Sequence, residues 1–408
     1  MRIGIERIGL YAGAAVIDVA RLAEARGLDP LRFANLLMRR KSLSFRFEDP
    51  VSFAVNAARP LVDALTTAQK ASIELLVVAT ESGIDWGKSV STYVHRHLDL
   101  PRRCRMFEIK QACYGGTAAL QTAAAFVAAR EGQARALVIC TDLARCVPHS
   151  YAEPAQGCAA VALLVGADPA VLELEPGASG LHGYEVMDSC RPTADTETGD
   201  VDLSLLSYLD CIEQSFRAYR DAVGPVDFVD HFDYLACHTP FGGMVRGAHR
   251  TMMRKFRPGP PPVVEQDFDR RVRPALTFCQ EVGNIYSGTV FLALAGVLAT
   301  GDFARPRRIG LFSYGSGCCS EFYSGIATAA SSDAVRALGI DAALAARREL
   351  SVAEYDTLLA AERASLFGLR DAAVETSPFA GIYESHFAGR GLLVLDRIEG
   401  YQRKYRWS

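Results

Sequence analysis

The sequence lacks the features that mark membrane, nucleic-acid-binding and metal-binding proteins. Its longest apolar run, residues 288–299, is shorter than the roughly 20 residues that a membrane-spanning helix needs. The net charge is only −3, with acidic and basic residues interspersed, which argues against a nucleic-acid footprint. Cys and His do not occur in zinc-ligand spacings, and there is no phosphate-loop motif. We therefore expect no membrane, nucleic-acid or metal association.

Disulfide spacing is also missing, although the chain contains 11 cysteines. They are dispersed and odd in number, which predicts reduced thiols in a cytoplasmic protein. The first residues weakly imitate a signal peptide, but Glu6 and Arg7 interrupt the apolar run, which favours an ordinary first strand over residues 3–10. The 408 residues are 50% hydrophobic, enough for a large core in one domain or in two fused halves.

Several strand-like runs end in polar or glycine-rich segments. Residues 73–80 lead to Glu81, residues 106–109 to Cys113, residues 136–140 to Asp142, residues 232–237 to His238, and residues 308–312 to Ser313-Tyr314-Gly315-Ser316-Gly317. Helical runs separate these strands, which predicts an α/β fold with largely parallel pairing. In such sheets, ligands bind at the carboxyl ends of the strands.

Cys113 stands between a strand-like run and an alanine-rich helical run that ends near Gly132. At a helix N-terminus, unpaired amides and the helix dipole stabilise a thiolate. Gly115 and Gly116 let an acyl group and its carrier approach the backbone closely. The pattern predicts a nucleophile. A buried structural cysteine is the competing interpretation, because free cysteine is among the most buried residue types.

The order of these features indicates an internal duplication. When Cys113 is set against Asn284, the following glycine-containing segments and apolar helical runs align, and Glu81 then corresponds to His238. Two similar halves that meet at one site are therefore expected.

We place the division in the polar, glycine-containing stretch 168–183. The N-terminal half, residues 1–175, carries Glu81 and Cys113, and the C-terminal half, residues 176–408, carries His238 and Asn284. Between the functional segments, the acidic residues 195–202 read as a turn, and residues 331–366 read as helical.

The chemistry of these four residues suits carbon–carbon bond formation. A thiolate can attack an activated acyl group to give an enzyme thioester. A carboxylate such as Glu81 can remove a proton from the acyl methyl group, if donors such as backbone amides at Cys113 and in the 314–317 loop hold the enolate oxygen. His238 can hydrogen-bond a second substrate's carbonyl. Each residue also has an ordinary interpretation: Glu81 as an ion-pair partner, His238 as a loop residue, and Asn284 as a turn residue.

Together the motifs resemble the 3-hydroxy-3-methylglutaryl (HMG) synthases of the thiolase superfamily. The motifs are Thr80-Glu81-Ser82-Gly83-Ile84-Asp85, Ala112-Cys113-Tyr114-Gly115-Gly116, Phe232-Asp233-Tyr234 before His238-Thr239-Pro240-Phe241, Gly283-Asn284-Ile285-Tyr286, and Ser313-Tyr314-Gly315-Ser316-Gly317. The likeness runs from the first strand to at least Gly325. It implies a thiolase-like αβαβα fold of five layers, built from two similar halves and usually homodimeric.

The resemblance also implies roles. Cys113 is the acetyl-carrying nucleophile, Glu81 the general acid/base, and His238 orients the acceptor thioester. The residues expected to bind substrate are Asn284, Ser316, Gly315, Tyr314, Thr239 and Pro240. No bound cofactor is expected; the phosphopantetheine arm of an acyl carrier protein, or coenzyme A, carries the substrates.

One departure favours a particular branch of the family. Enzymes of the mevalonate route generally carry a lysine a few residues after the catalytic histidine, where it helps to hold nucleotide phosphates; this chain has Gly243. Losing a fixed ammonium group matters more for a free coenzyme than for a protein-tethered arm. The chain from His238 to Arg250 resembles the polyketide β-branching enzymes, whose donor and acceptor arrive on acyl carrier proteins. A second departure is Cys146, where an aromatic residue is expected in the mevalonate enzymes.

A basic run follows this motif, and we expect Arg246, Arg250 and Arg254 to contact the acidic carrier protein and the pantetheine phosphate. The competing interpretation is a solvated helix face.

The sequence therefore predicts an acyltransferase of polyketide antibiotic biosynthesis. It would condense a Cys113-bound acetyl group with the β-ketone of a carrier-bound intermediate and then hydrolyse the enzyme thioester. The alternatives are a mevalonate-pathway synthase that uses acetyl-CoA and acetoacetyl-CoA, and a catalytically silent scaffold that binds carrier proteins. A decarboxylating ketosynthase would not need Glu81, because it makes its carbanion by losing carbon dioxide.

Overall fold

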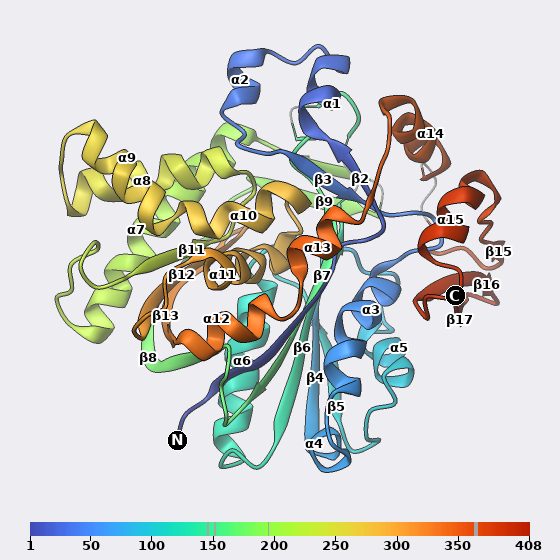
Figure 1. The fold of residues 1–408 in the computed structure, drawn as a ribbon, viewed down its shortest axis with the longest axis horizontal. Coiled ribbons are helices and arrows are strands. Elements are labelled where there is room, and N and C mark those ends of the chain that lie inside the picture. The colour runs from blue at the N-terminus through green and yellow to red at the C-terminus, as the bar shows by residue number, and fades with distance from the viewer. Residues whose placement is uncertain (145–146, 151, 195, 363–365) are drawn as a thin grey trace.

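The computed structural model describes residues 1–144, 147–150, 152–194, 196–362 and 366–408. Within them, the main sheet has the strand order β11-β12-β13-β8-β1-β7-β6-β4-β5 (Figure 1). Its strands are β1 (Gly4–Tyr11), β4 (Ile73–Ala79), β5 (Arg105–Ile109), β6 (Arg135–Leu143), β7 (Cys158–Gly166), β8 (Leu172–Gly183), β11 (Tyr234–Cys237), β12 (Arg307–Gly315) and β13 (Cys319–Ala327).

The helices that cover this sheet follow the strand–helix alternation of the sequence. They are α3 (Pro50–Asp63), α4 (Thr67–Ala71), α5 (Val90–His97), α6 (Gly115–Ala129), α7 (Val201–Val223), α8 (Gly242–Phe256), α9 (Pro261–Arg271), α10 (Arg273–Val282), α11 (Thr289–Thr300) and α12 (Ala329–Arg336). A short 3₁₀ turn, η1 (Tyr286–Gly288), precedes α11.

Alternating side chains show how these elements are layered. In β6, Val138 points into a core with α6 and α11, whereas Ile139 points into a separate core with α3. In β12, Leu311 enters the first of these cores and Phe312 enters a third one with α7 and α8. The strands near β6 and those near β12 thus enclose a shared layer of helices and carry outer helices on their far faces. Figure 1 shows α6 and α3 on opposite sides of β4 and β6. The arrangement is the expected αβαβα order.

The two parts of the sheet repeat one topology. In the first part, β4 is parallel to β6, and β6 is antiparallel to β7, which pairs with β1. In the second, β11 is parallel to β12, and β12 is antiparallel to β13, which pairs with β8. The prediction of two similar halves is therefore confirmed by the fold. The division at residue 175 stays a prediction; the stretch 168–183, read from the sequence as a boundary, contains β8.

Local sequence signals explain why several elements begin where they do. Asp49 caps α3, because its side chain accepts the amide of Ser52 at 2.9 Å while the Ser52 hydroxyl accepts the amide of Asp49. Pro50 occupies the first turn, where a missing amide costs little. Gly315 ends β12 three residues beyond the predicted strand.

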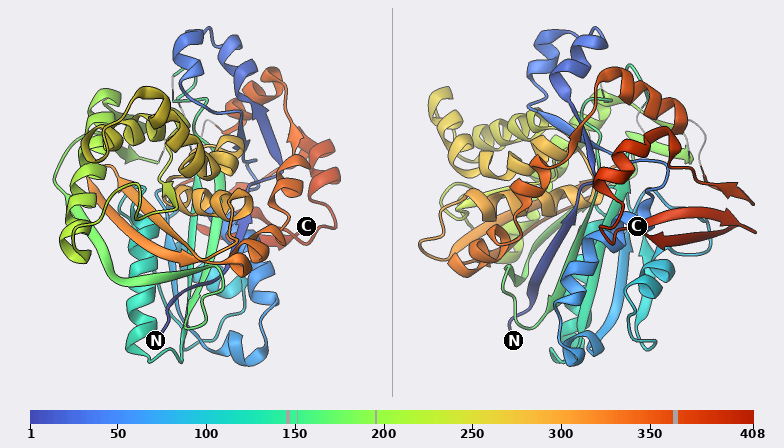
Figure 2. Two further views of the ribbon diagram at one scale, coloured as in Figure 1. Left: turned by 60° about the vertical axis from the view of Figure 1, so that its left-hand side comes forward. Right: turned by 45° about the vertical axis from the view of Figure 1, so that its right-hand side comes forward.

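The remaining elements lie at the rim of the layered core. They are β2 (Ala15–Asp18), α1 (Val19–Ala25), α2 (Pro30–Ala34), β3 (Arg40–Leu43), β9 (Ser189–Thr193), β10 (Thr196–Gly199), α13 (Ile340–Ala345), β14 (Arg348–Glu349), α14 (Val352–Glu362), β15 (Ala372–Ala373), η2 (Ser377–Phe379), α15 (Ala380–His386), β16 (Leu393–Glu399) and β17 (Gln402–Trp407). Both views in Figure 2 show α1 and α2 at the end of the molecule opposite the N-terminus.

Two sequence expectations were wrong in this rim. The helical stretch 331–366 is broken, because Gly339 has φ +61° and β14 then pairs with β2. Most of the acidic stretch 195–202 is not a turn: β10 pairs with β9 as a separate two-stranded sheet, and α7 starts at Val201. Among the described residues, we find no helix with the length and apolarity that crossing a membrane requires.

Candidate active site

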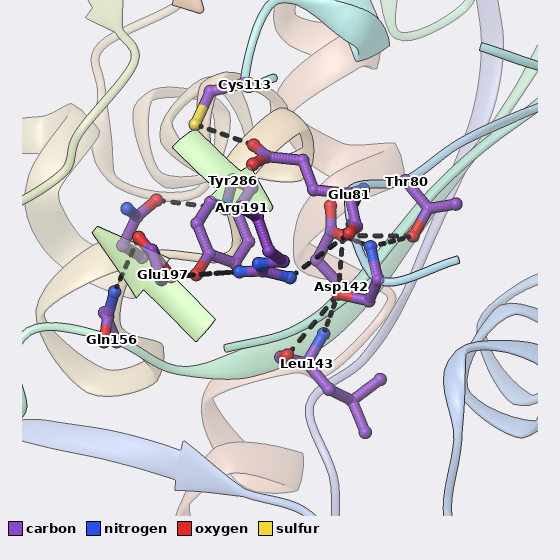
Figure 3. Close-up of polar contacts among 11 residues, drawn as sticks. Thr80, Glu81, Cys113, Asp142, Leu143, Gln156, Arg191, Glu197 and Tyr286 are labelled. Carbon is purple, nitrogen blue, oxygen red and sulfur yellow. Dashed lines mark hydrogen bonds and ion pairs between the residues drawn. The ribbon is translucent and has the colours of Figure 1, made fainter. Parts of the chain in front are cut away.

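Glu81 and Cys113 meet at the carboxyl ends of two neighbouring strands. Glu81 follows β4, and Cys113 follows β5 and precedes the first turn of α6. The Cys113 thiol donates a hydrogen bond of 3.3 Å to the Glu81 carboxylate (Figure 3). Ala112, with φ +43°, turns the chain so that the thiol points at this carboxylate instead of continuing the strand. The predicted place of Cys113 at a helix N-terminus is confirmed.

Burial raises the pKa of both groups. Burial and the nearby Asp142 carboxylate raise the pKa of Glu81 to about 8, while Arg191 acts in the opposite direction. Burial, followed by the charge of Glu81, raises the pKa of the Cys113 thiol well above its usual range. The thiol is therefore protonated at neutral pH, and the expectation of a stabilised thiolate at this helix N-terminus was wrong, because burial and the charge of Glu81 outweigh the helix dipole. The Glu81 carboxylate is placed to accept its proton as the thiol attacks.

Asp142 fixes the backbone that carries Glu81. It is fully buried at the end of β6, and its Oδ1 accepts the Glu81 amide at 2.8 Å and the Ser82 amide at 3.1 Å. The hydroxyls of Thr80 and Ser82 donate to the same oxygen, at 3.0 and 2.9 Å. These bonds hold the turn after β4 in one conformation, so that the Glu81 side chain leaves it toward Cys113.

His238 follows β11 and is 2% exposed. Its amide donates to the Phe312 carbonyl at 2.7 Å, and its carbonyl accepts the Tyr208 hydroxyl at 2.6 Å. Burial lowers its pKa to about 3, so the imidazole is neutral at pH 7. Its Nδ1 atom is buried and has no hydrogen-bond partner among the described residues. A buried ring nitrogen without a partner is suited to a substrate group.

Asn284 is held by its own turn. Its Oδ1 accepts the Tyr286 amide at 3.0 Å and the Thr289 hydroxyl at 3.1 Å, and its amide donates to the Ala155 carbonyl at 2.7 Å. These bonds occupy the side-chain oxygen of Asn284 and leave its NH₂ group available as a hydrogen-bond donor.

The 313–317 loop of the sequence analysis, which comprises the end of β12 and the turn after it, lies directly against the Cys113 turn. A side chain on Gly315 would come within 2.5 Å of the Gln111 carbonyl and 2.6 Å of the Tyr114 amide, so glycine is needed for this approach. Tyr314 donates its hydroxyl to Asp188 at 2.5 Å, and the Gly317 amide donates to the same carboxylate at 2.9 Å.

These contacts limit what the loop can offer a substrate. The Tyr314 hydroxyl and the Gly317 amide are already used by Asp188, whereas Ser316 is partly exposed and its amide and hydroxyl make no hydrogen bond within the described residues. Ser316 is thus an available donor of the loop, and the buried Ser313 hydroxyl likewise has no partner among the described residues. The Thr239 hydroxyl donates back to the Cys237 carbonyl at 2.8 Å, and Pro240 is partly exposed beside it.

Glycines also bring the two halves of the fold together behind Cys113. A side chain on Gly116 would lie 2.6 Å from the Ser287 carbonyl and 2.7 Å from the Cys140 sulfur. The start of α6 therefore packs on η1, the turn that follows Asn284. Close packing here sets the Cys113 turn next to the Asn284 turn, as the duplication predicted.

A second group of polar residues lies beside Glu81 and was not predicted from the sequence. Arg191 of β9 donates to the Glu81 carbonyl at 3.2 Å, to the Tyr286 hydroxyl at 2.8 Å and to Glu197 of β10 at 3.0 Å (Figure 3). Asp142 ended a strand-like run and could have been singled out on that ground. Arg191 and Glu197 carried no such signal, because their hairpin read as irregular chain.

Models of the hydroxymethylglutaryl-coenzyme A synthase N-terminal and C-terminal parts match residues 1–170 and 262–383. The chain belongs to the hydroxymethylglutaryl-coenzyme A synthase family. It is 50% identical over 415 residues to the polyketide biosynthesis 3-hydroxy-3-methylglutaryl-ACP synthase PksG of Bacillus subtilis. The aligned region covers 99% of each protein. It is 34% identical to the hydroxymethylglutaryl-CoA synthase of Enterococcus faecalis, over 88% of this chain and 92% of that protein.

Among solved structures, the curacin biosynthetic pathway HMG synthase in complex with acetyl donor-ACP is similar to this chain, with 51% identity, a TM-score of 0.97 and full coverage of both chains. The predicted family, the thiolase-like fold and the acyltransferase class are thereby confirmed.

The three arginines that the sequence suggested for carrier binding lie along α8, and two of them form ion pairs. Arg246 and Arg250 both bind Glu265 of α9, at 2.6 and 2.7 Å. Arg254 is exposed and makes no ion pair with any described residue. Their role in carrier binding stays a prediction. Cys146, the other departure from the mevalonate enzymes, lies outside the described residues.

Gly243 lies at the start of α8, in contact with the chain that follows α2. Its amide donates to the Leu36 carbonyl at 3.2 Å, and a side chain on Gly243 would collide with the Asn35 carbonyl. The same segment approaches Gly242, where an added Cβ would lie 2.8 Å from the Leu37 side chain. The synthase thus has no room for a lysine at this position.

Replacing Glu81 by Gln should make Cys113 react with iodoacetamide at lower pH. The Glu81 carboxylate raises the pKa of the thiol, so removing its charge lowers that pKa and moves the midpoint of the rate–pH profile down. Peptide-level mass spectrometry measures the rate at Cys113. Glu175→Gln is the matched control, because Glu175 is partly buried on β8 and binds Arg308 and Ser324 instead. An unchanged or higher midpoint in Glu81→Gln would contradict the assignment.

Proposed function

We propose that this HMG synthase acts in polyketide β-branching. It condenses a Cys113-bound acetyl group, delivered by a donor acyl carrier protein, with the β-ketone of an intermediate on an acceptor carrier protein. The observation that carries the proposal is the 3.3 Å contact between the Cys113 thiol and the Glu81 carboxylate, in a chain that matches PksG along its whole length. A nucleophile and a base in contact are what a two-stage acyl transfer and condensation needs.

Acetyl transfer comes first. The Cys113 sulfur attacks the carbonyl carbon of the donor thioester, and its proton passes to Glu81 or to solvent. The tetrahedral intermediate then expels the carrier's pantetheine thiolate, which takes up a proton. An acetyl-Cys113 thioester remains on the enzyme. The helix dipole at the start of α6 and nearby amides stabilise the negative oxygen formed during this step.

Condensation follows on the same carboxylate. Ionised Glu81 removes a proton from the acetyl methyl group, and the resulting enolate carbon bonds to the β-carbon of the acceptor. The acceptor oxygen becomes an alkoxide and is protonated to a tertiary alcohol. The raised pKa of Glu81 suits this role, because a carboxylate with a pKa near the working pH is a stronger base than an ordinary one.

Neutral His238 and Asn284 serve as hydrogen-bonding groups. We assign Nδ1 of His238, which has no partner among the described residues, to the acceptor substrate. In the tautomer that carries its proton on Nδ1, this N–H would donate a hydrogen bond to the ketone oxygen of the acceptor. The Asn284 NH₂ group and Ser316 are assigned to thioester oxygens. Because burial keeps His238 neutral, it orients and polarises the acceptor as a hydrogen-bond donor instead of carrying a permanent charge.

Hydrolysis completes the cycle. Water attacks the Cys113 thioester, the C–S bond breaks, and the released Cys113 thiolate takes up the proton that the water loses. The product is a 3-hydroxy-3-carboxymethyl chain that stays tethered to the acceptor carrier through its own thioester. No external oxidant, reductant or metal ion enters this balance.

The surroundings of Gly243 support carrier-bound substrates over free coenzyme A. The chain at residues 35–37 fills the space into which a phosphate-binding side chain would extend. A tethered pantetheine arm needs fewer contacts, since the carrier protein adds its own docking surface. We place that surface on α8, where Arg254 makes no ion pair within the described part of the chain and the Arg246–Arg250–Glu265 group keeps one surplus positive charge.

We further propose a homodimer. β5 is the last strand of the main sheet, and its residues are partly or fully exposed. An open edge strand with unpaired backbone groups is suited to pairing with a second copy.

Substitutions at the two central residues should separate the steps. Cys113→Ala should abolish acetyl loading, because no nucleophile remains. Glu81→Ala should still load acetyl but condense at least about 10²-fold more slowly, the usual scale of general-base catalysis. Intact-protein mass spectrometry follows loading, and analysis of the acceptor carrier follows condensation. Normal condensation by Glu81→Ala would rule out its assigned role.

Donor preference tests the carrier assignment directly. Brief incubation with acetyl-loaded carrier protein should acetylate Cys113 faster than the same concentration of acetyl-CoA, as measured by intact mass. Equal or faster loading from acetyl-CoA, together with turnover of acetoacetyl-CoA, would instead support a mevalonate-pathway synthase.

Arg254→Ala should weaken the carrier reaction at low salt. Removing one exposed charge reduces attraction to an acidic partner, so we expect the apparent KM for the donor carrier to rise by about 3- to 10-fold, with kcat little changed. Raising the ionic strength should shrink this difference. Arg102→Ala is the control, because Arg102 is also exposed but precedes β5, at the edge of the main sheet opposite β11 and α8. Equal effects of the two substitutions would exclude a specific α8 surface.

A further inference from the structure

The hairpin β9–β10 lies apart from the main sheet, yet it is attached to the active site at two levels. At its base, Asp188 accepts the Tyr314 hydroxyl and the Gly317 amide, and its carbonyl accepts the Asp200 amide at 2.9 Å. Farther along, the Arg191 side chain of β9 lies between the Glu81 turn and the Tyr286–Glu197 pair (Figure 3). The hairpin is therefore held by side-chain and loop contacts at the site, including one to Tyr314 at the end of β12, and not by backbone pairing with the main sheet.

The guanidinium of Arg191 joins three different segments. Nη1 donates to the main-chain carbonyl of Glu81 at 3.2 Å, and Nη2 donates to Tyr286 and Glu197. The Tyr286 hydroxyl in turn donates to Glu197 at 2.9 Å, and the guanidinium carbon lies 5.2 Å from the Tyr286 ring centre. The Arg191 side chain is 15% exposed. A planar fork with several fixed donors can hold such an arrangement, whereas a lysine cannot.

The segments that Arg191 joins are the ones that carry the chemistry. Glu81 follows β4 in the first half of the fold. Tyr286 belongs to η1 in the second half, and its amide binds the Asn284 side chain. Tyr286 also has φ +49°, a conformation that needs support from its neighbours. Gln156 completes the group through a 3.3 Å bond to Glu197.

Arg191 is also the cation whose charge lowers the pKa of Glu81. The charged or titratable groups that face Glu81 are Cys113, Asp142, Arg191, Glu197 and Tyr286. Burial and the two acidic neighbours raise the pKa of Glu81, and Arg191 lowers it. Without Arg191, Glu81 would ionise only at higher pH.

We propose that Arg191 is a positioning residue of the condensation step: its fork holds the Glu81 turn against Tyr286 and Glu197, and so sets where the Glu81 carboxylate meets the acetyl group on Cys113. The proposal rests on the proposed function of Glu81. Arg191 itself does not touch the reacting atoms and acts through the Glu81 backbone and through its charge. Glu197 and Tyr286 hold the guanidinium in place.

The test compares Arg191→Gln, Arg191→Lys and Glu197→Gln with the wild type over a range of pH. Single-turnover condensation of preformed acetyl-enzyme is the readout, and acetyl loading is measured in parallel. Arg191→Gln should slow condensation at pH 7 by about 10-fold or more and move the midpoint of its acid limb up by about one pH unit, because a buried carboxylate loses its nearest cation. Loading should change by less than about 3-fold, since in that step the Cys113 proton can also pass to solvent and the Glu81 carboxylate need not reach the methyl group.

The other two variants separate charge from geometry. Arg191→Lys should restore the midpoint but not the rate, because lysine supplies charge without the fork. Glu197→Gln should move the midpoint down, opposite in sign to Arg191→Gln, because it removes a negative charge that raises the pKa of Glu81. This variant also provides the test if Arg191→Gln does not fold.

Arg135→Gln is the matched structural control. Arg135 is partly buried and links Glu6 and Ser72 at 2.7 and 3.0 Å, away from Glu81. Its loss should affect thermal stability without moving the pH midpoint. A wild-type midpoint and rate in Arg191→Gln, or a midpoint in Glu197→Gln that stays or rises, would overturn the proposal.

Every rate is expressed relative to the wild type with the substrates that the wild type turns over, on carrier protein or on coenzyme A. If the wild type condenses only coenzyme A thioesters, the carrier assignment fails but the Arg191 test still stands. If the wild type condenses but Glu81→Ala does so equally well, the role of Glu81 fails and the Arg191 proposal fails with it.

Discussion

The rest of the active site depends on a thiol and a carboxyl group buried in contact with each other. Two groups that would repel as anions are placed 3.3 Å apart, in surroundings that disfavour either charge. Such a pair can hold a single negative charge that moves from carboxylate to sulfur when the thiol gives up its proton. The dense hydrogen bonding of Asp142 to the Glu81 turn keeps the pair together against the cost of burying it.

The layered fold explains why residues from distant parts of the chain meet at this pair. Strands β4 and β11 occupy equivalent places in the two halves and end beside the shared helical layer, so Glu81 and His238 are delivered toward the same region. Small residues make the halves fit closely: Gly116 and Gly315 let backbones approach to distances that any side chain would prevent. The chemistry of the site therefore depends on packing between the halves as much as on the catalytic side chains.

The sequence predicted the residues that end strands and missed those held by tertiary contacts. Glu81, Cys113 and His238 each follow an apolar run of strand length, so the hydrophobic pattern of the sequence was enough to predict that they lie after strands. Arg191 sits on a strand without an apolar period, and Glu197 lies in a stretch that read as a turn, so only the fold shows that they reach Glu81. The directions of Tyr314 and Thr239 were likewise set by partners, Asp188 and the Cys237 carbonyl, that sequence spacing does not reveal. Gly339 shows the same limit for the fold, since its left-handed backbone divides a continuous helical pattern.

The contact between Gly243 and the chain at residues 35–37 bears on how carrier-dependent and coenzyme-dependent synthases can be related by descent. A single substitution that introduced lysine at position 243 would drive its Cβ into the Asn35 carbonyl. Because the Gly243 amide also donates to the Leu36 carbonyl, the chain at residues 35–37 makes room for a side chain only by changing its own path. A change from one kind of thioester to the other through this position therefore couples two distant parts of the chain, the start of α8 and the segment after α2.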